Sequence, residues 1–208
     1  PEILSLPPLK TINCHAGKLP FYRGRNILNW ALINDEKEFG ITVHFVDEGI
    51  DTGDIIKQQC YPINDHDDYK TLLVKSYVEC ANVLYESIKS IQEDKVTRIS
   101  QKSIHPLGFY CSARKEGDEV IVWNQTSRDI FNFVRSICKP GPEARAYLGF
   151  KELKINQVIY LPDAPSYKGI PGAVVGCEKD AFFVKTKDTF VKVTQWSGAN
   201  PHIGDRFQ

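Results

Sequence analysis

An amide, an imidazole and a carboxylate are the side chains of this sequence best suited to chemistry: Asn13, His15 and Asp51. Asn13 and His15 are two positions apart in a stretch, residues 10–15, that predicts a strand, so both side chains point to the same side of it. An amide donor and an imidazole therefore aim at one spot near the exit of a strand, where ligands usually bind in α/β sheets. Taken alone, this pair has a simpler explanation, which is that two polar side chains satisfy the backbone of a loop.

Asp51 lies in the segment Gly-Ile-Asp-Thr-Gly-Asp, residues 49–54, directly after a β-branched and aromatic stretch at 41–46. That stretch predicts a buried strand. The two glycines of the segment allow the backbone to approach a ligand closely. The carboxylate is therefore expected at the end of a strand, beside a place where a ligand can bind. His44 alternates with buried residues of the same strand, and we expect it to be structural.

The remaining pattern predicts an α/β part followed by a β-rich part. Apolar residues at spacings of three and four predict helices at 27–34, 65–92 and 126–138, with Asp67 or Asp68 capping the second and Ser127 the third. The helix at 65–92 is expected to pack on a sheet through a stripe formed by Leu72, Leu73, Ser76, Tyr77, Cys80, Val83, Leu84 and Ile88. Further extended segments are predicted at 55–61, 153–161, 172–176, 181–186 and 190–195. Several short strands at close spacing indicate a small barrel at the end of the chain.

Composition limits the classes of function. The 208 residues contain 26 basic and 26 acidic side chains, so the formal net charge is zero and a general nucleic-acid-coating protein is not expected. No apolar run is long enough to cross a bilayer, and the start shows no signal-peptide pattern. Six dispersed cysteines, no two closer than 20 residues, predict free thiols in a reducing cytoplasm, and no cluster of metal ligands is expected.

The order and spacing of three motifs resemble one family. The chain reads N-C-H, then L-P-x-Y-R-G-R-N, then G-I-T-V-H-x-V-D-E-G-I-D-T-G-D-I-I, which is similar to the formyltransferases that use 10-formyltetrahydrofolate. After a polar stretch, W-N-Q-T-S-R-D-I-F-N-F-V-R-S-I-C-K-P-G-P-E-A and the closing G-A-V-V-G-C resemble the small C-terminal domain of the tRNA and sugar enzymes of that family. The resemblance covers nearly the whole chain.

The resemblance implies an α/β fold: a Rossmann-like formyltransferase domain followed by a small, β-rich, barrel-like (OB-like) domain. We expect residues 1–105 to be the C-terminal portion of the catalytic domain, 106–119 a linker and 120–208 the β-rich domain. Full-length members carry further strands and helices before the part that resembles this chain. The chain begins at Pro1 and contains no methionine, so we expect that front portion of the domain to be missing here.

By resemblance, Asn13, His15 and Asp51 match the catalytic triad of the family, and their chemistry suits formyl transfer. Attack of a neutral amine on a formyl carbon produces a tetrahedral oxyanion, to which an amide and an imidazole can donate hydrogen bonds. Asp51 can orient His15, favour its charged form and help to move the amine proton. No metal is needed for this chemistry.

The loop after His15 and the turn around Asp51 supply the expected binding residues. Contacts to sugar, nucleotide phosphate or folate are expected from Tyr22, Arg23, Arg25, Asn26 and Trp30. Core packing of Trp30 and a surface ion pair of Arg25 remain alternatives. The backbone of Glu48, Gly49, Ile50 and Thr52 is expected to line the pterin pocket, whereas Asp47 and Asp54 are expected to cap turns.

Within the family, R-G-R-N-I-L-N-W resembles the enzymes that act on amino sugars, and it implies a dTDP- or UDP-linked 4-amino sugar as acceptor, for surface polysaccharides such as O-antigen. Residues 116–208 carry 12 basic and 11 acidic side chains, whereas a domain that grips tRNA is expected to be distinctly basic. Methionyl-tRNA formyltransferase is the alternative, and a non-catalytic binding remnant is a third possibility. We expect a cytoplasmic protein, possibly a homodimer, that binds folate and neither membrane nor nucleic acid.

Overall fold

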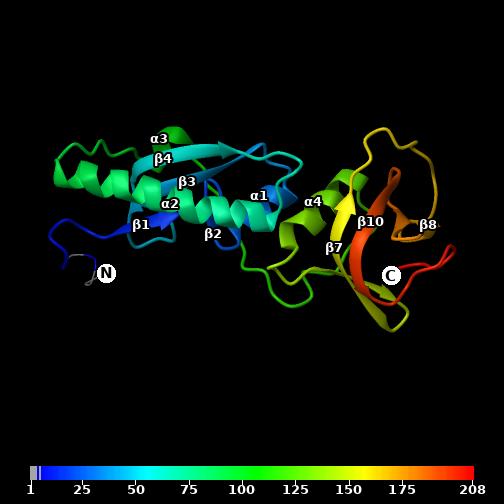
Figure 1. Ribbon diagram of the computed structural model, residues 1–208. Helices are drawn as coiled ribbons and strands as arrows, with labels where there is room; N and C mark the ends of the chain where they lie inside the picture. The colour runs from blue at the N-terminus through cyan, green and yellow to red at the C-terminus, as the bar shows by residue number, and fades with distance from the viewer. Residues whose placement is uncertain (1–3, 5) are drawn as a thin grey trace. The chain divides into compact units, whose positions relative to one another are not determined.

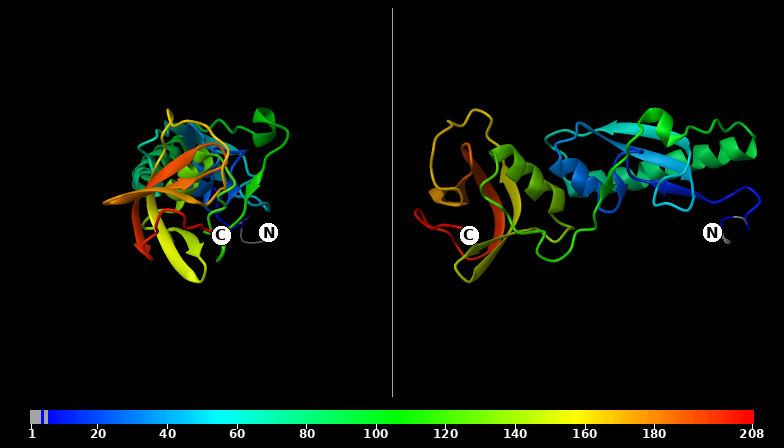
Figure 2. Two further views of the ribbon diagram at one scale, coloured as in Figure 1. Left: turned by 90° about the vertical axis from the view of Figure 1, so that its right-hand side faces the viewer. Right: turned by 180° about the vertical axis from the view of Figure 1, so that it is seen from behind.

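The computed structural model describes residue 4 and residues 6–208, and they form two compact units (Figures 1 and 2). Unit 1 comprises the described residues up to Ala31, together with Glu36–His66 and Thr71–Arg114. Unit 2 comprises Leu32–Asp35, Asp67–Lys70 and Lys115–Gln208.

A three-stranded antiparallel sheet forms the centre of unit 1. Its order is β1 (Ile12–His15), β3 (Glu38–Phe45) and β4 (Ile55–Pro62), with β3 in the middle. The register of the first pair sets Asn13 opposite His44. All three strands were expected from the sequence.

The central strand β3 begins three residues earlier than expected, because the glycine within it does not interrupt the strand. Gly40 lies outside the strand predicted at 41–46, yet it pairs with Cys60 on β4. A Cβ at this position would lie 2.7 Å from the Cα of Lys18. Because Gly40 has no side chain, the loop after β1 can approach β3 closely at this position. The backbone of Gly40 still pairs with β4 in the ordinary way.

The long helix α2 (Tyr69–Gln92) lies against this sheet (Figure 1). The Cys14 thiol of β1 donates to the Cys80 carbonyl at 3.6 Å, and the Tyr61 hydroxyl of β4 donates to Glu79 at 2.9 Å. The predicted helix is confirmed, although its apolar stripe is only partly buried. Its buried positions are Leu72, Ser76, Val83 and Ser87, whereas Tyr77 and Ile88 are exposed.

The polar stretch that follows α2 is built into unit 1 as far as Arg114. It contains a short helix, α3 (Gln101–Ile104), and a short strand, β5 (Tyr110–Cys111). β5 pairs in parallel with β2 (Arg23–Gly24), which lies in the loop after β1 and precedes α1 (Ile27–Ile33). The stretch therefore reaches back to the loop that carries the predicted binding residues.

Unit 2 contains the amphipathic helix α4 (Ser127–Ile137). The expectation that Ser127 caps this helix is wrong, because the cap is Thr126. Its hydroxyl accepts from the Asp129 backbone N–H, and the Asp129 carboxylate accepts from the Thr126 backbone N–H, which is a complete capping box. Ser127 instead donates its backbone N–H to Asp188 at 2.8 Å.

A five-stranded antiparallel sheet completes unit 2. The strands are β6 (Ala144–Leu148), β7 (Lys151–Ile159), β8 (Val174–Glu178), β9 (Ala181–Lys185) and β10 (Phe190–Gly198). Their order is β6-β7-β10-β9-β8, so β6 and β8 are the edges. The β-rich C-terminal domain is confirmed, but in the described part of the chain no ladder closes this sheet into a barrel.

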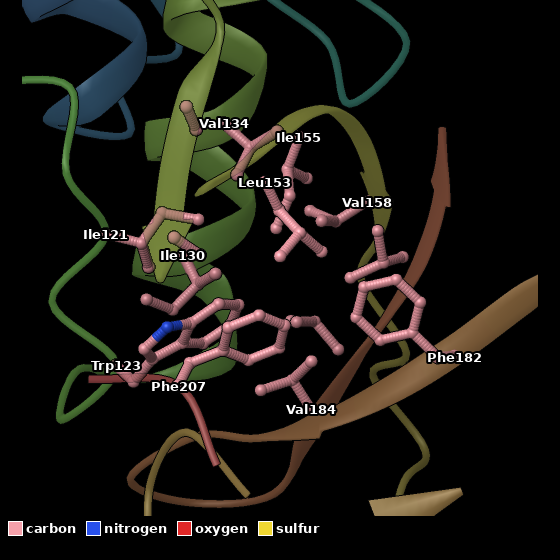
Figure 3. Packing of buried hydrophobic residues seen from close by; sticks show 14 of the residues in the cluster. Ile121, Trp123, Ile130, Val134, Leu153, Ile155, Val158, Phe182, Val184 and Phe207 are labelled. Atoms are coloured by element: carbon pink, nitrogen blue, oxygen red, sulfur yellow. The ribbon is translucent and has the colours of Figure 1, made fainter. Parts of the chain in front are cut away.

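The core of unit 2 lies between α4 and the sheet (Figure 3). Ile130 and Val134 of the helix are fully buried against Leu153 and Ile155 of β7. At the other end the Trp123 ring stacks on Phe207, with ring centroids 5.4 Å apart. Unit 2 therefore has a hydrophobic core of its own.

Three further features bear on the sequence expectations. The six cysteines all lie in the described residues, and each is a free thiol. Across residues 4 and 6–208, no helix has the length and apolar character needed to span a membrane. The same residues contain no group of three His, Cys, Asp or Glu side chains placed to hold a metal ion.

Candidate active site

The structure brings Asn13, His15 and Asp51 together in unit 1. The Asn13 amide nitrogen lies 3.4 Å from Asp51 Oδ1, and His15 Nδ1 lies 3.6 Å from Asp51 Oδ2. The side chains of His15 and Asp51 are 9% and 12% exposed. The imidazole and the carboxylate therefore face each other at a place largely shielded from water.

The imidazole of His15 is held from both sides of its ring. Nε2 lies 2.7 Å from the Tyr22 carbonyl, which can only accept, so Nε2 carries a proton and donates. Nδ1 faces the Asp51 carboxylate and is the ring nitrogen left for proton transfer. Gly17 makes this arrangement possible, because a Cβ there would lie 2.3 Å from His15 Nε2.

A second imidazole, that of His44, completes the cluster. His44 is 2% exposed, and its Nε2 lies 3.3 Å from the Asn13 amide nitrogen and 3.6 Å from Asp51 Oδ1. Its Nδ1 lies 2.8 Å from the Phe45 carbonyl and must donate to it, which leaves Nε2 as an acceptor for Asn13 in the neutral ring. His44 is buried as expected, but its place beside Asn13 and Asp51 was not predicted.

These contacts fix which way the Asn13 amide points. A carboxylate only accepts hydrogen bonds, so the amide nitrogen, and not its oxygen, faces Asp51. Both contacts of this nitrogen, at 3.3 and 3.4 Å, are long for hydrogen bonds. Contacts of catalytic groups often tighten only when reactants bind, so an N–H of Asn13 can turn to a reacting oxygen at little cost.

The backbone of Asp51 is in the left-handed region, with φ of 54°. This conformation is uncommon for a residue other than glycine, and surrounding contacts must maintain it. The Gly24 backbone N–H donates to Asp51 Oδ2 at 2.8 Å, and the Gln101 side-chain amide donates to the Asp51 carbonyl at 2.8 Å. Asp51 is thus held at its carboxylate by the loop that contains Gly24 and at its main chain by Gln101 of α3, 50 positions later.

The residues predicted to bind the acceptor begin in the loop after β1, and they differ in how far their side chains are free to contact a ligand. Tyr22 is buried and donates its hydroxyl to Glu36 at 2.5 Å, and its carbonyl receives His15. The Arg23 guanidinium donates to Gln101 and packs over the Tyr110 ring. Both side chains are therefore committed to internal contacts.

The other three predicted acceptor-binding residues face outward to a greater degree. Arg25 and Asn26 are exposed, and Asn26 accepts from the Arg114 backbone N–H at 2.9 Å. Trp30 is half-buried and donates its ring N–H to the Ser112 carbonyl, with the Arg114 guanidinium over its face. One cation, that of Arg114, and the aromatic surface of Trp30 are thus adjacent, which suits a phosphorylated ligand with a ring.

The predicted cofactor loop is a turn organised by Asp47. Its carboxylate accepts from the Thr52 hydroxyl at 2.6 Å and from the Gly49 N–H at 3.2 Å, so Asp47 caps the turn as expected. Glu48, Gly49 and Ile50 are exposed, with Ile50 66% exposed. The turn therefore presents exposed polar backbone and an apolar side chain beside Asp51.

A pocket of about 240 Å³ in unit 1 is lined in part by Tyr22, whose carbonyl receives His15. Its lining includes the aromatic side chains of Phe21, Tyr22 and Phe109 together with Glu36 and Lys18. None of Asn13, His15 and Asp51 lines it. Tyr22 is thus common to this pocket and to the surroundings of His15.

Cys14 lies between Asn13 and His15 in sequence but is not a nucleophile. Its side chain points away from them towards α2, where its hydrogen bonding with Cys80 and its burial raise the pKa of its thiol. A thiol with a raised pKa remains neutral at pH 7 and is a poor nucleophile. The alternation of side chains along β1 accounts for this separation.

Two family models match the chain: formyl transferase over residues 1–88, and formyl transferase, C-terminal domain, over residues 114–201. The chain is 37% identical over 196 residues to methionyl-tRNA formyltransferase of Pelotomaculum thermopropionicum, covering 94% of this chain and 61% of that protein. It is 31% identical to methionyl-tRNA formyltransferase of Carboxydothermus hydrogenoformans, covering 100% of this chain and 70% of that protein.

Among solved structures, the chain is similar to WlaRD, a sugar 3N-formyl transferase crystallised in the presence of dTDP and 5-N-formyl-THF. The TM-score is 0.71 at 26% identity, covering 92% of this chain and 66% of that one. The chain spans about three fifths of the length of the first curated relatives that it matches. Its sequence and fold place this chain in the formyl transferase family.

Proposed function

We propose that the full-length protein transfers a formyl group from 10-formyltetrahydrofolate to the amino group of a nucleotide-linked amino sugar. The observation that carries the proposal is the convergence of Asn13 and His15 on Asp51: the Asn13 amide nitrogen and His15 Nδ1 lie 3.4 and 3.6 Å from its carboxylate oxygens. Residues 1–105 contribute the catalytic part in this proposal, residues 106–119 a connection and residues 120–208 an accessory domain.

In the proposed reaction, each residue of the cluster has a separate role. The neutral amine attacks the formyl carbon, a C–N bond forms, and the carbonyl oxygen becomes negatively charged. An N–H of Asn13 donates to that oxygen, and one such donor stabilises the transition state by about 3–4 kcal/mol. Because Nε2 of His15 is occupied by Tyr22, the proton lost by the amine moves through Asp51 and His15 Nδ1. The bond to the cosubstrate nitrogen then breaks, and that nitrogen receives the proton.

The cosubstrate is assigned to the turn at residues 48–52. Its exposed backbone and Ile50 lie directly beside the carboxylate of Asp51, and the similar sugar enzyme WlaRD was crystallised with a formylated folate. 10-Formyltetrahydrofolate supplies the formyl group as a consumed cosubstrate. A backbone edge that can both donate and accept hydrogen bonds suits a pterin.

A sugar acceptor is favoured by the loop that follows β1. The Arg114 guanidinium lies over the face of Trp30, and Arg25 in the loop after β1 is exposed. An arginine beside an aromatic ring suits a ligand that carries phosphate together with a ring. Residues 116–208 carry 12 basic and 11 acidic side chains, which is a weak electrostatic footprint for RNA. The solved relative WlaRD acts on a sugar amine.

Methionyl-tRNA formyltransferase is the second candidate, and the curated relatives at 37% and 31% identity favour it. The chemistry of the cluster is the same for both acceptors, because each presents a primary amine. The two candidates differ in their dependence on salt. Binding of tRNA through phosphates weakens steeply as ionic strength rises, whereas binding of a nucleotide sugar depends on far fewer charges.

The experiment is an acceptor panel with the full-length protein and 10-formyltetrahydrofolate. dTDP- and UDP-linked 4-amino and 3-amino sugars are tested for the mass gain of one formyl group, and charged initiator tRNA is tested at low and high salt. Formylation of a nucleotide sugar supports the proposal, and formylation of tRNA alone overturns its acceptor. No product with any acceptor contradicts both candidates, provided that the protein is folded by circular dichroism.

We also propose that the reaction takes place in the cytoplasm, as a step in building surface polysaccharide such as O-antigen, and that the protein is a homodimer. The basis is the sugar acceptor assigned above, because nucleotide-linked sugars are the activated precursors of such polymers. Light scattering on the full-length protein gives the oligomeric state directly. A monomeric mass contradicts the dimer without affecting the assignment of the acceptor.

A further inference from the structure

Gln101 lies in α3, far from the motifs that carry the family resemblance, yet its side chain enters the centre of unit 1. It is 3% exposed. Its amide nitrogen donates to the carbonyls of Asp51 and Gly53, each at 2.8 Å. Its amide oxygen accepts from Nε and Nη2 of Arg23, at 3.1 and 2.6 Å. A buried amide with both donors and both lone pairs in use is a fully satisfied group.

Only one orientation of the Gln101 amide satisfies its four hydrogen bonds. The two carbonyls can only accept and the guanidinium can only donate, so exchanging the oxygen and nitrogen of the amide would lose all four hydrogen bonds. Glutamate at this position keeps the acceptor for Arg23 but loses both donors. Methionine keeps the length and the packing of the side chain but loses donors and acceptor alike. The two substitutions therefore separate the contact to Arg23 from the contacts to the loop of Asp51.

Gln101 connects the two loops that carry the proposed site. Arg23 is followed by Gly24, whose backbone N–H donates to the Asp51 carboxylate at 2.8 Å. Gln101 holds the Asp51 backbone and the Arg23 side chain at the same time. The position of the carboxylate relative to His15 is therefore determined from both its main chain and its side chain.

The main chain around Gln101 is anchored independently. The Ile99 backbone pairs with Ile55 through two hydrogen bonds, of 2.8 and 3.0 Å, and β5 pairs with β2. The segment from Ile99 to Cys111 thus contacts the start of β4 on one side and the Arg23–Gly24 loop on the other. This anchoring gives the side-chain amide a fixed point from which to hold Asp51 in its left-handed conformation.

We propose that Gln101 is a positioning residue for formyl transfer: through the Asp51 and Gly53 carbonyls it fixes the carboxylate that faces His15. The proposal rests on the proposed function, because it gives Gln101 a part in the same reaction. The hydrogen bonds described for the Gln101 side chain go to Asp51, Gly53 and Arg23 and not to His15 or Asn13, so it acts through these three residues. A misplacement of about 1 Å at such a group lowers the rate about 10²-fold.

The test uses the full-length protein with Gln101→Met and Gln101→Glu, and Gln92→Met as the matched control. Gln92 is an exposed residue at the end of α2. We expect both Gln101 variants to lower kcat by about 10- to 100-fold, with KM for both substrates changed less than about threefold. A loss of kcat without a change in KM separates misplacement of a reacting group from loss of a binding contact. Gln92→Met is expected to behave as the parent protein.

A second measurement does not need a known acceptor. Imidazole ¹H–¹⁵N spectra report the tautomer and environment of His15, and we expect its signals to shift in both Gln101 variants while those of the exposed His202 in unit 2 stay in place. Unchanged His15 signals together with kcat within about twofold of the parent overturn the proposal. If no acceptor is formylated by the parent protein, the proposed function fails, but shifted His15 signals still establish the positioning contact. If Gln101→Met does not fold, Gln101→Glu, which retains the Arg23 contact, carries the same two measurements.

Discussion

The Asn13 amide nitrogen lies 3.4 Å from the Asp51 carboxylate, although 38 positions separate the two residues. The register of β1 on β3 places Asn13 opposite His44, one residue before the end of β3. The chain then turns, and the Phe45 N–H donates to the Asp54 carbonyl at 2.9 Å, which returns the loop to the end of the strand. The cluster is therefore a consequence of one strand pairing and one closed loop.

Replacing His15 tests the centre of the cluster. We expect His15→Asn to lower kcat by about 10²- to 10⁴-fold, because the variant loses the group that accepts and returns a proton beside Asp51. Turnover of the full-length protein with 10-formyltetrahydrofolate and its acceptor gives the value. His66→Asn is the matched control, since His66 is exposed. A His15→Asn variant that keeps about a third of the parent turnover contradicts the assignment of His15.

Gly17 tests whether close packing positions the imidazole. A methyl group at this position would lie 2.3 Å from His15 Nε2 and 2.6 Å from the Tyr22 carbonyl. We expect Gly17→Ala to lower the free energy of unfolding by about 1–3 kcal/mol and to reduce kcat, because the ring must move. Urea denaturation and turnover are the measurements. Gly176→Ala is the control, because its nearest contact is the Phe183 ring at 3.2 Å, and equal effects of the two substitutions argue against a specific role for Gly17.

Asp188 makes the stability of unit 2 dependent on pH. Burial acts to raise the pKa of this carboxyl, but hydrogen bonds from the Ser127 N–H, the Thr186 hydroxyl and the Thr189 N–H outweigh it and lower the pKa below its usual value of 3.8. A lowered pKa contributes stability that is fully present above the unfolded pKa and is lost as pH falls through the folded pKa.

Removing this charge is therefore expected to matter at neutral pH and not in acid. Asp188→Asn is expected to lower the free energy of unfolding by about 1–2 kcal/mol at pH 7, because hydrogen bonds to a charged acceptor become hydrogen bonds to a neutral one. The difference from the parent protein should shrink as pH falls from about 5 to below 3.8. Denaturant unfolding across this range measures it, and a difference that stays constant with pH disproves the mechanism.

The capping box of α4 has an energetic consequence of its own. We expect Thr126→Ala to lower the free energy of unfolding by about 1 kcal/mol, because the Asp129 N–H loses its acceptor. Thr126→Ser retains a hydroxyl at the same place and is expected to unfold as the parent protein does. Thermal or denaturant unfolding distinguishes the two. Equal losses from both substitutions indicate that the methyl group, and not the hydroxyl, matters here.

Much of the fold was accessible from sequence because its elements have strong local signals. The alternation of residues 41–46 and the three-and-four spacing in the long helix correspond to β3 and α2. The errors occurred where a residue has two possible uses. The strand predicted at 41–46 stops short of Gly40, but Gly40 lies in β3, where its missing side chain also lets the Lys18 backbone approach. Ser127 was predicted to cap the helix, but the hydroxyl residue before it, Thr126, is the cap.

The sequence by itself determined that Asn13 and His15 share one side of a strand, because side chains alternate along any extended chain. It also determined, by resemblance, that Asp51 belongs with them. Only the tertiary structure decided that His44 joins this cluster and that Gln101 holds it, from 50 positions beyond Asp51. The physical reason is that strand register and the path of a loop are set by contacts between residues far apart in sequence. No local sequence pattern therefore predicts which residues the side chain of Gln101 contacts.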